Sequence, residues 1–152
     1  MLKATVGPSA DMVARYRFVT KGEEIFGYYS GNSFANQLGI SMQVPRKIEI
    51  VSNNSNSSPR EIEIGGRKFL IRKSSIVINR ENVYVLQLLE LLKNIEVYMD
   101  GSYDEARVKI EEYIDIHDIR KESVNRYIRE FPINVFKNYY ELGLDNVFAQ
   151  RK

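Results

Sequence analysis

The sequence predicts an α+β fold in which a small mixed or antiparallel sheet with a hairpin packs on a helical second half. Two observations lead to this prediction. Short runs of β-branched and aromatic residues, separated by glycine, proline and asparagine, fill residues 9–78. Apolar side chains then recur at helical spacing through residues 79–143. No linker or internal repeat divides the 152 residues, so we interpret 1–152 as a single domain with its own core.

The first predicted element is a helix from Ser9 or Ala10 to about Val19. The apolar residues that share one of its faces are Met12, Val13, Tyr16 and Val19. Residues 25–29 follow as a strand, because this segment is rich in β-branched and aromatic side chains.

A sharp turn, a short helix and another strand are predicted next. Gly31 permits the turn, and Asn32 or Ser33 caps a helix that ends at Gly39. The side chains of this helix that point inward are Phe34, Ala35 and Leu38. Residues 47–51 alternate polar and apolar side chains, which is typical of a strand with one exposed face.

A β-hairpin is the best determined local structure. Residues 61–64 and 67–72 flank the pair Gly65-Gly66, which is a two-residue turn signal. This register places Ile62 opposite Phe69, and directly opposed residues share a face. The predicted buried face consists of Ile62, Ile64, Phe69 and Ile71. The predicted exposed face consists of Glu61, Glu63, Lys68, Leu70 and Arg72. A polar loop, 52–58, precedes the hairpin, and residues 76–78 are predicted as a further short strand.

Four helices are predicted in the second half. Asn79 is a good N-cap for the first helix, whose apolar residues cover nearly its whole circumference and indicate a central position. Ser102 and Glu105 have the spacing of a capping box for the second helix. Its apolar stripe is Ala106, Ile110, Tyr113, Ile114 and His117. The third helix carries Val124, Tyr127, Ile128 and Phe131. The fourth begins near Pro132, carries Val135, Phe136, Tyr139 and Tyr140, and ends at Gly143.

The composition excludes several classes of protein. Cysteine is absent, which excludes disulfides and thiolate metal sites and indicates a reducing cytoplasm. No apolar run approaches the roughly 20 residues of a membrane span, and no secretory signal is visible, so we expect a cytoplasmic protein without membrane contact. The net charge of +2 is unevenly distributed. Residues 46–73 hold seven basic and three acidic residues, whereas residues 81–122 hold five basic and eleven acidic residues.

The sequence predicts no catalytic residue, no metal ligand and no cofactor. The spacing around Ser30 does not match a nucleophile elbow, and the only histidine, His117, lies at the edge of a helix stripe. The acidic residues between Glu111 and Asp118 have the spacing of a solvated helix face.

A divergent metal-dependent nuclease is the weakest alternative. Glu49, followed by Glu61 and Glu63 on strands, resembles the carboxylate pattern of such enzymes. Position 63, however, carries a glutamate where those enzymes place a lysine that orients the attacking water.

A basic surface borne by the sheet is the predicted binding site for a nucleic acid or another partner. Its residues are Arg46, Lys47, Arg60, Arg67, Lys68, Arg72 and Lys73. Such a surface tracks phosphates in nucleic-acid-binding proteins. The alternative is that these cations pair across strands with Glu61 and Glu63 and keep the sheet soluble.

The order of motifs between Gly27 and Lys73 resembles a known family. The segments are GYYSGNSFANQLGISMQVP, then KIEIVSN, then REIEIGGRK, with VLQLLELL in the helical half. On these segments the chain resembles the bacterial AbiEi-like family, whose members are transcriptional regulators and antitoxins of type IV toxin–antitoxin systems. The residues that carry the resemblance as scaffold are Gly27, Tyr28, Ser30, Gly31, Asn36, Leu38, Gly39, Gln43, Pro45, Gly65 and Gly66.

The resemblance implies a non-enzymatic antitoxin, associated with abortive infection, that counteracts a nucleotidyltransferase-like toxin and represses its own operon. Family members bind operator DNA through an amino-terminal winged helix. About 25 residues precede Gly27, which are too few for such a domain, so we expect operator binding to require a part that this chain lacks. The remaining function is the antitoxic one, with the basic hairpin as its surface. The alternative is a regulatory domain that binds nucleic acid through that hairpin, and a homo-oligomer is compatible with both.

Overall fold

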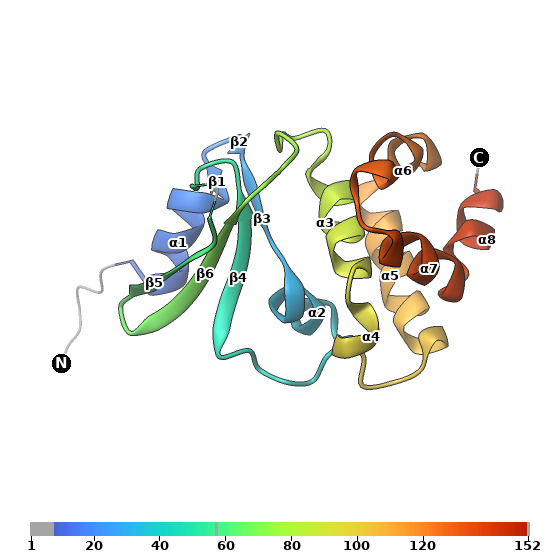
Figure 1. The fold of residues 1–152 in the computed structure, drawn as a ribbon, viewed down its shortest axis with the longest axis horizontal. Helices are drawn as coiled ribbons and strands as arrows, with labels where there is room; N and C mark the ends of the chain where they lie inside the picture. The colour runs from blue at the N-terminus through green and yellow to red at the C-terminus, as the bar shows by residue number, and fades with distance from the viewer. Residues whose placement is uncertain (1–7, 57, 152) are drawn as a thin grey trace.

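The computed structural model describes residues 8–56 and 58–151, and they adopt the predicted α+β arrangement. The strands all lie in the first half of the described chain and form a two-stranded and a four-stranded sheet, whereas helices make up the second half. Figure 1 shows the four-stranded sheet between α1 on one side and the helical half on the other. The fold class predicted from the sequence is confirmed.

The four-stranded sheet is mixed. Its strands are β3 (Gly27–Tyr29), β4 (Lys47–Ser52), β5 (Arg60–Ile64) and β6 (Arg67–Lys73), in the spatial order β3-β4-β6-β5. The β5–β6 hairpin has the predicted register, with Ile62 opposite Phe69, and both turn glycines have positive φ. β4 and β6 run parallel, whereas the other two pairs are antiparallel. The second strand of the hairpin is therefore central and the first strand lies at the edge.

Helix α1 (Ala10–Phe18) covers one face of this sheet. The stripe predicted from the sequence is wrong at Met12 and Tyr16, which are 62% and 57% exposed. The helix instead buries Ala14 and Phe18 against apolar side chains of β4 and β6. The face of α1 that packs on the sheet is the one with Ala14, whose small side chain lets the helix approach the strands closely.

The strand predicted at residues 25–29 is interrupted at Phe26. A separate antiparallel hairpin forms from β1 (Thr20–Lys21) and β2 (Glu24–Ile25), and β3 starts only at Gly27. The backbone N–H groups of Phe26 and Gly27 both donate to the Val19 carbonyl, at 2.8 and 3.1 Å, which takes the chain out of the first ladder. The β1–β2 hairpin was not predicted, because alternation is not visible in strands of two residues.

Helix α2 (Gly31–Leu38) begins two residues earlier than the sequence indicated. Its N-cap is Ser30, so the predicted caps Asn32 and Ser33 are wrong. The turn at Gly31 is nevertheless the predicted one, with φ +58°, and the helix ends as expected at Gly39, with φ +82°. Because Gly31 completes the turn, α2 begins at Gly31 and not at Ser33.

The strand predicted at residues 76–78 is wrong, since this segment is irregular. The side chain of Asn53 takes the place of a neighbouring strand: it donates to the Ile78 carbonyl at 2.8 Å and accepts the Ile78 N–H at 2.9 Å. Asn79 is not the N-cap of the next helix. Its side chain accepts the N–H groups of Glu81 and Asn82, which closes a preceding turn, and Asn82 occupies the N-cap position.

Helix α3 (Val83–Leu92) is central, as predicted, with eight of its ten residues buried. One side packs on the second face of the sheet, where Val83 and Leu86 contact Tyr28 and Val51. The other side faces the helical half. The helix therefore joins the two halves of the molecule.

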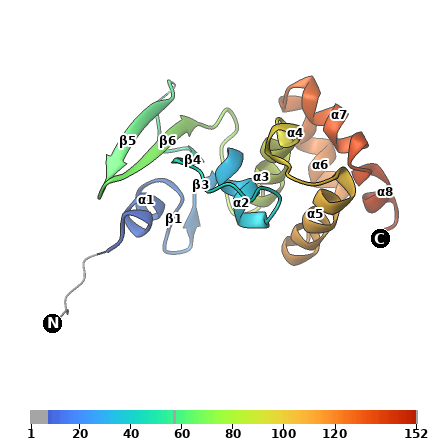
Figure 2. The ribbon, with the colours of Figure 1, turned by 90° about the horizontal axis from the view of Figure 1, so that it is seen from below.

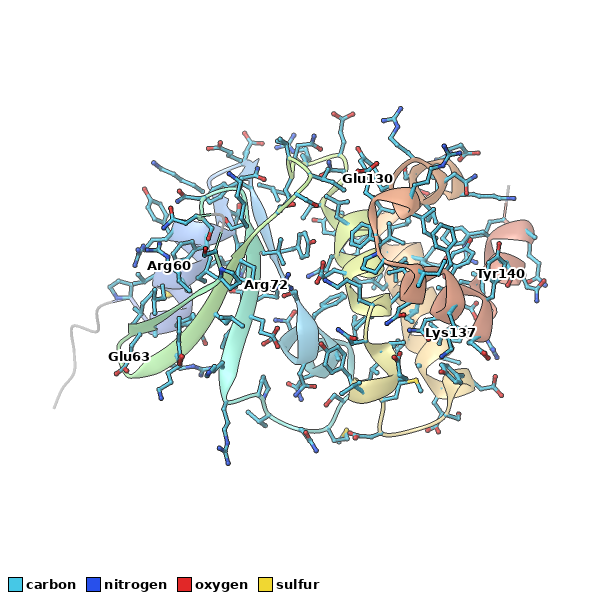
Figure 3. The ribbon with its side chains drawn as sticks, in the orientation of Figure 1. Arg60, Glu63, Arg72, Glu130, Lys137 and Tyr140 are labelled. Carbon is cyan, nitrogen blue, oxygen red and sulfur yellow. The ribbon has the colours of Figure 1, made fainter. Side chains whose placement is uncertain are left out.

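The remaining helices lie on the side of α3 away from the sheet (Figure 1). Helix α5 (Tyr103–His117) begins with the predicted capping box of Ser102 and Glu105. The third predicted helix is divided into α6 (Lys121–Tyr127) and a 3₁₀ turn, η1 (Ile128–Glu130). Helix α7 (Ile133–Glu141) follows Pro132, and two short helices, α4 (Ile95–Tyr98) and α8 (Leu144–Ala149), were not predicted. Tyr140, one of the apolar residues named for the fourth predicted helix, is 61% exposed on the outer surface of the helical half (Figure 3).

Candidate functional site

The two glycines at the start of the motif segment are required by their surroundings. A Cβ at Gly27 would lie 1.9 Å from the carbonyl oxygen of Phe18. A Cβ at Gly31 would lie 2.5 Å from the carboxylate of Glu49, and its positive φ disfavours any larger residue. Gly27 lets β3 approach the end of α1. Gly31 lets the start of α2 pack closely against β4.

Polar side chains of the same segment attach α2 to the strand that follows it. The Ser33 hydroxyl accepts the N–H of Glu49 at 2.9 Å and donates to the Lys47 carbonyl at 3.4 Å. The amide of Asn36 donates to the carbonyls of Ser41 and Gln43, at 3.1 and 3.0 Å, which holds the loop before β4.

The other motif residues also shape the backbone and the core. Tyr28 is buried against α3, and burial raises the pKa of its phenol well above the usual range. Ser30 is buried at the N-cap, whereas Leu38 and Pro45 are half-buried and Gln43 is exposed. Gly65 and Gly66 form the hairpin turn. The residues that carry the family resemblance therefore lie mainly where the sheet and the helices meet.

The register divides the predicted basic surface between two faces of the sheet, because directly opposed residues share a face. The face toward the helical half carries Lys47, Lys68 and Arg72, and it also carries Glu49, Glu61 and Glu63. The face toward α1 carries Arg60, Arg67 and Lys73. Arg46 precedes β4. In Figure 3, Arg72 lies on the side of the helices and Arg60 on the side of α1. The seven cations therefore do not form one continuous patch.

Ion pairs occupy two of the cations near the surface. Lys47 contacts Glu61 at 3.3 Å, and Arg67 contacts Asp11 of α1 at 3.7 Å. Both pairs are substantially exposed, so each contributes about 0–1 kcal/mol. Of the seven predicted cations, those that make no ion pair with another described residue are Arg46, Arg60, Lys68 and Lys73.

Arg72 belongs to a half-buried charged cluster, not to the exposed surface. Its guanidinium lies 2.8 Å from the carboxylate of Glu90 in α3, and the ammonium of Lys93 lies 2.9 Å from the same carboxylate. The nearby Glu49 carboxylate has its pKa raised, chiefly because burial disfavours its charged form, although the charge of Arg72 opposes this shift. The cluster links β4, β6 and α3 electrostatically.

The carboxylates of the nuclease alternative have separate contacts. Glu49 lies at the start of α2, against Gly31, whereas Glu61 pairs with Lys47 on the exposed part of the face. Within residues 8–56 and 58–151, no three histidine, aspartate or glutamate side chains gather to hold a metal ion. No helix in the described part of the chain is long and apolar enough to span a membrane.

The structure also brings together residues that the sequence did not indicate as a group. A hollow of about 540 Å³ lies where α1, α2 and β3 meet α3 and α5. The aromatic rings among its lining residues are Tyr28, Tyr29, Phe34, Tyr84, Tyr113 and His117. We call this hollow the aromatic groove. Because its rings come from four different elements, no short sequence motif predicts this groove.

Comparison of the chain with protein-family models, with curated proteins and with solved structures found no match.

Proposed function

We propose that this chain is the non-enzymatic effector domain of an AbiEi-like antitoxin. It acts in the cytoplasm and counteracts a nucleotidyltransferase-like toxin. In the family that the chain resembles, autorepression of the operon belongs to an amino-terminal winged helix.

The observation that supports this proposal is that the motif segments fold into one continuous unit. The segments from Gly27 to Lys73 form β3, α2, β4, β5 and β6 without an inserted element, and their motif residues make the contacts between these elements. A resemblance built from such contacts concerns a shared fold, because the matched residues Gly27, Gly31 and Asn36 each support the backbone arrangement. The antitoxic contacts then lie on the surface that this scaffold presents.

The exposed cations near the turn of the hairpin are the proposed contact surface. Lys68 lies directly beside Lys47 across the parallel β4–β6 pair, and Arg46 precedes Lys47 in the chain. Lys68 and Arg46 make no ion pair with a described residue, so their charges are available to an acidic partner. Arg72, which the sequence placed in the same surface, is excluded from it by its contact with Glu90.

Co-expression with the neighbouring toxin gene tests the proposal by measuring growth. The chain, or the longer protein that contains it, should restore growth. The double variant Arg46→Glu and Lys68→Glu should reduce this rescue while the protein remains folded. Arg126→Glu with Arg129→Glu is the matched control, since it makes the same charge change at exposed positions of the helical half. Failure of both the chain and the longer protein to rescue growth would contradict the proposed function, and equal rescue by the two double variants would contradict the proposed surface.

The second candidate function is nucleic-acid binding through the hairpin, and it is favoured by the exposed Lys68, which makes no ion pair with another described residue. The alternation of three cations with three carboxylates on one face weighs against it, because phosphates are repelled by that face as much as attracted. A gel shift at low salt distinguishes the two: binding that weakens steeply with added salt supports phosphate contacts, and no shift excludes them.

A further inference from the structure

The aromatic groove differs in charge from the rest of the sheet half. Of its lining residues Arg15 and His117 are the only ones that carry an ionisable basic group, and no lining residue is a carboxylate. Arg15 is exposed on α1 and makes no ion pair within the described residues. Burial lowers the pKa of His117, so its imidazole is predominantly neutral near pH 7. The groove therefore presents one cation beside neutral aromatic surface.

The rings in the groove are held in place by contacts with one another. His117 stacks on Tyr84 with ring centroids 3.8 Å apart, and Tyr113 lies 4.5 Å from His117. The hydroxyl of Tyr113 donates to the buried amide of Gln87, whose nitrogen donates to the Tyr29 carbonyl at 2.9 Å. The half-exposed rings of Tyr84 and His117 are thus preorganised.

The groove lies across the joint between the two halves. Figure 2 shows α2 between α1 and α5, and residues of all three helices line the groove. A second hollow, of about 450 Å³, shares Arg15, Tyr29 and Gln37 with it and extends toward Asp11 and Arg67, which pair with each other at 3.7 Å. Arg15 and the stacked pair of Tyr84 and His117 thus line the same hollow.

We propose that the aromatic groove binds a nucleotide, with the base on an outer face of the stacked Tyr84–His117 pair and the phosphate at Arg15. Aromatic side chains accept any base by stacking, and arginine is the preferred partner of a phosphate. The volume of about 540 Å³ is within the usual range for small-molecule sites, roughly 300–1,000 Å³. Gln37 at the rim offers both a donor and an acceptor to the edge of the base. This site is distinct from the hairpin surface and does not depend on the proposed antitoxic function.

Titration of the ¹⁵N-labelled chain with AMP, GMP, CMP and UMP tests this inference by NMR. We expect shifts confined to α1, α2 and the facing parts of α3 and α5. Adenosine and ribose 5-phosphate, which each lack one half of the ligand, should bind more weakly than AMP. Titration with the trinucleotide of adenosine distinguishes a nucleotide within a strand from a free nucleotide as the ligand. Tighter binding than AMP indicates an unpaired nucleotide of a strand, and equal binding indicates a free nucleotide.

Arg15→Ala should weaken binding roughly tenfold to a hundredfold, because hydrogen bonds to charged groups are the stronger ones. Arg17→Ala is the matched control: it removes the same charge from the same helix but does not line the groove. His117→Leu should weaken binding by removing the stacking ring while keeping an apolar side chain. No shift with any mononucleotide at about 5 mM, shifts centred on β5 and β6, or equal weakening by the Arg15 and Arg17 variants would overturn the proposal.

Discussion

Replacement of Glu90 by glutamine is expected to loosen the joint between the sheet and the helical half. The Glu90 side chain is 10% exposed and is the shared partner of Arg72 on β6 and Lys93 at the end of α3. Glutamine keeps the shape of the side chain and removes its charge. Two cations then remain in a half-buried site without their direct partner, and Glu49 is the nearby carboxylate that is left.

The magnitude follows from the exposure of the two cations. Breaking a fully buried pair costs about 3–5 kcal/mol. Arg72 and Lys93 retain 28% and 27% exposure, so water can solvate them in part, and we expect a loss of about 2 kcal/mol. For a chain of this size, that corresponds to a fall in melting temperature of about 4–8 °C.

Urea denaturation and thermal melting measure this loss. Glu81→Gln is the matched control, because Glu81 is exposed just before α3 and makes no ion pair within the described residues. If Glu90→Gln costs no more than this control, the cluster does not hold the joint. The double variant Arg72→Met and Glu90→Leu should recover most of the lost stability, because a buried ion pair is replaceable by apolar side chains of similar volume.

Three further changes probe the same region. Gly31→Ala should cost about 1–3 kcal/mol in urea denaturation, because the added Cβ meets the Glu49 carboxylate at a residue with positive φ; an unchanged midpoint would contradict this contact. Glu49→Gln should gain stability relative to the native chain as pH rises above 4.5, since the raised pKa means that the folded state loses a proton less readily than the unfolded state. Melting curves from pH 4 to 8 measure that difference, and a constant difference would refute the shift. Gln87→Leu should cost about 2 kcal/mol in urea, because it leaves the buried hydroxyl of Tyr113 without its acceptor and the Tyr29 carbonyl without its donor; Gln37→Leu, at the exposed rim, is the control.

The predicted faces of the hairpin show where sequence reasoning reaches its limit. The alternation of residues correctly assigned Phe69 and Ile71 to the buried side. It also assigned Arg72 to the exposed side, because a hairpin considered alone has one free face. The helical half covers part of that face, so Arg72 is half-buried and paired with Glu90. The identity of the covering element is a long-range property that alternation does not contain.

The same limit applies to the candidate sites. Seven cations within 28 residues indicated one basic surface, and the strand register separates them onto two faces. Conversely, the rings of the aromatic groove are spread from Tyr28 to His117, and they meet only because α3 and α5 pack beside β3 and α2. The sequence did not predict that these rings lie together, since each ring also fits an ordinary core position.

The sequence by itself determined the α+β order, the register of the β5–β6 hairpin, the capping box of α5 and the central position of α3. These features depend on residues within a few positions of one another, through turn geometry, caps and periodicity. Only the tertiary structure decided the parallel pairing of β4 with β6, the buried face of α1, the partner of Arg72 and the aromatic groove. These features depend on which surfaces meet, and that is set by the packing of the whole chain.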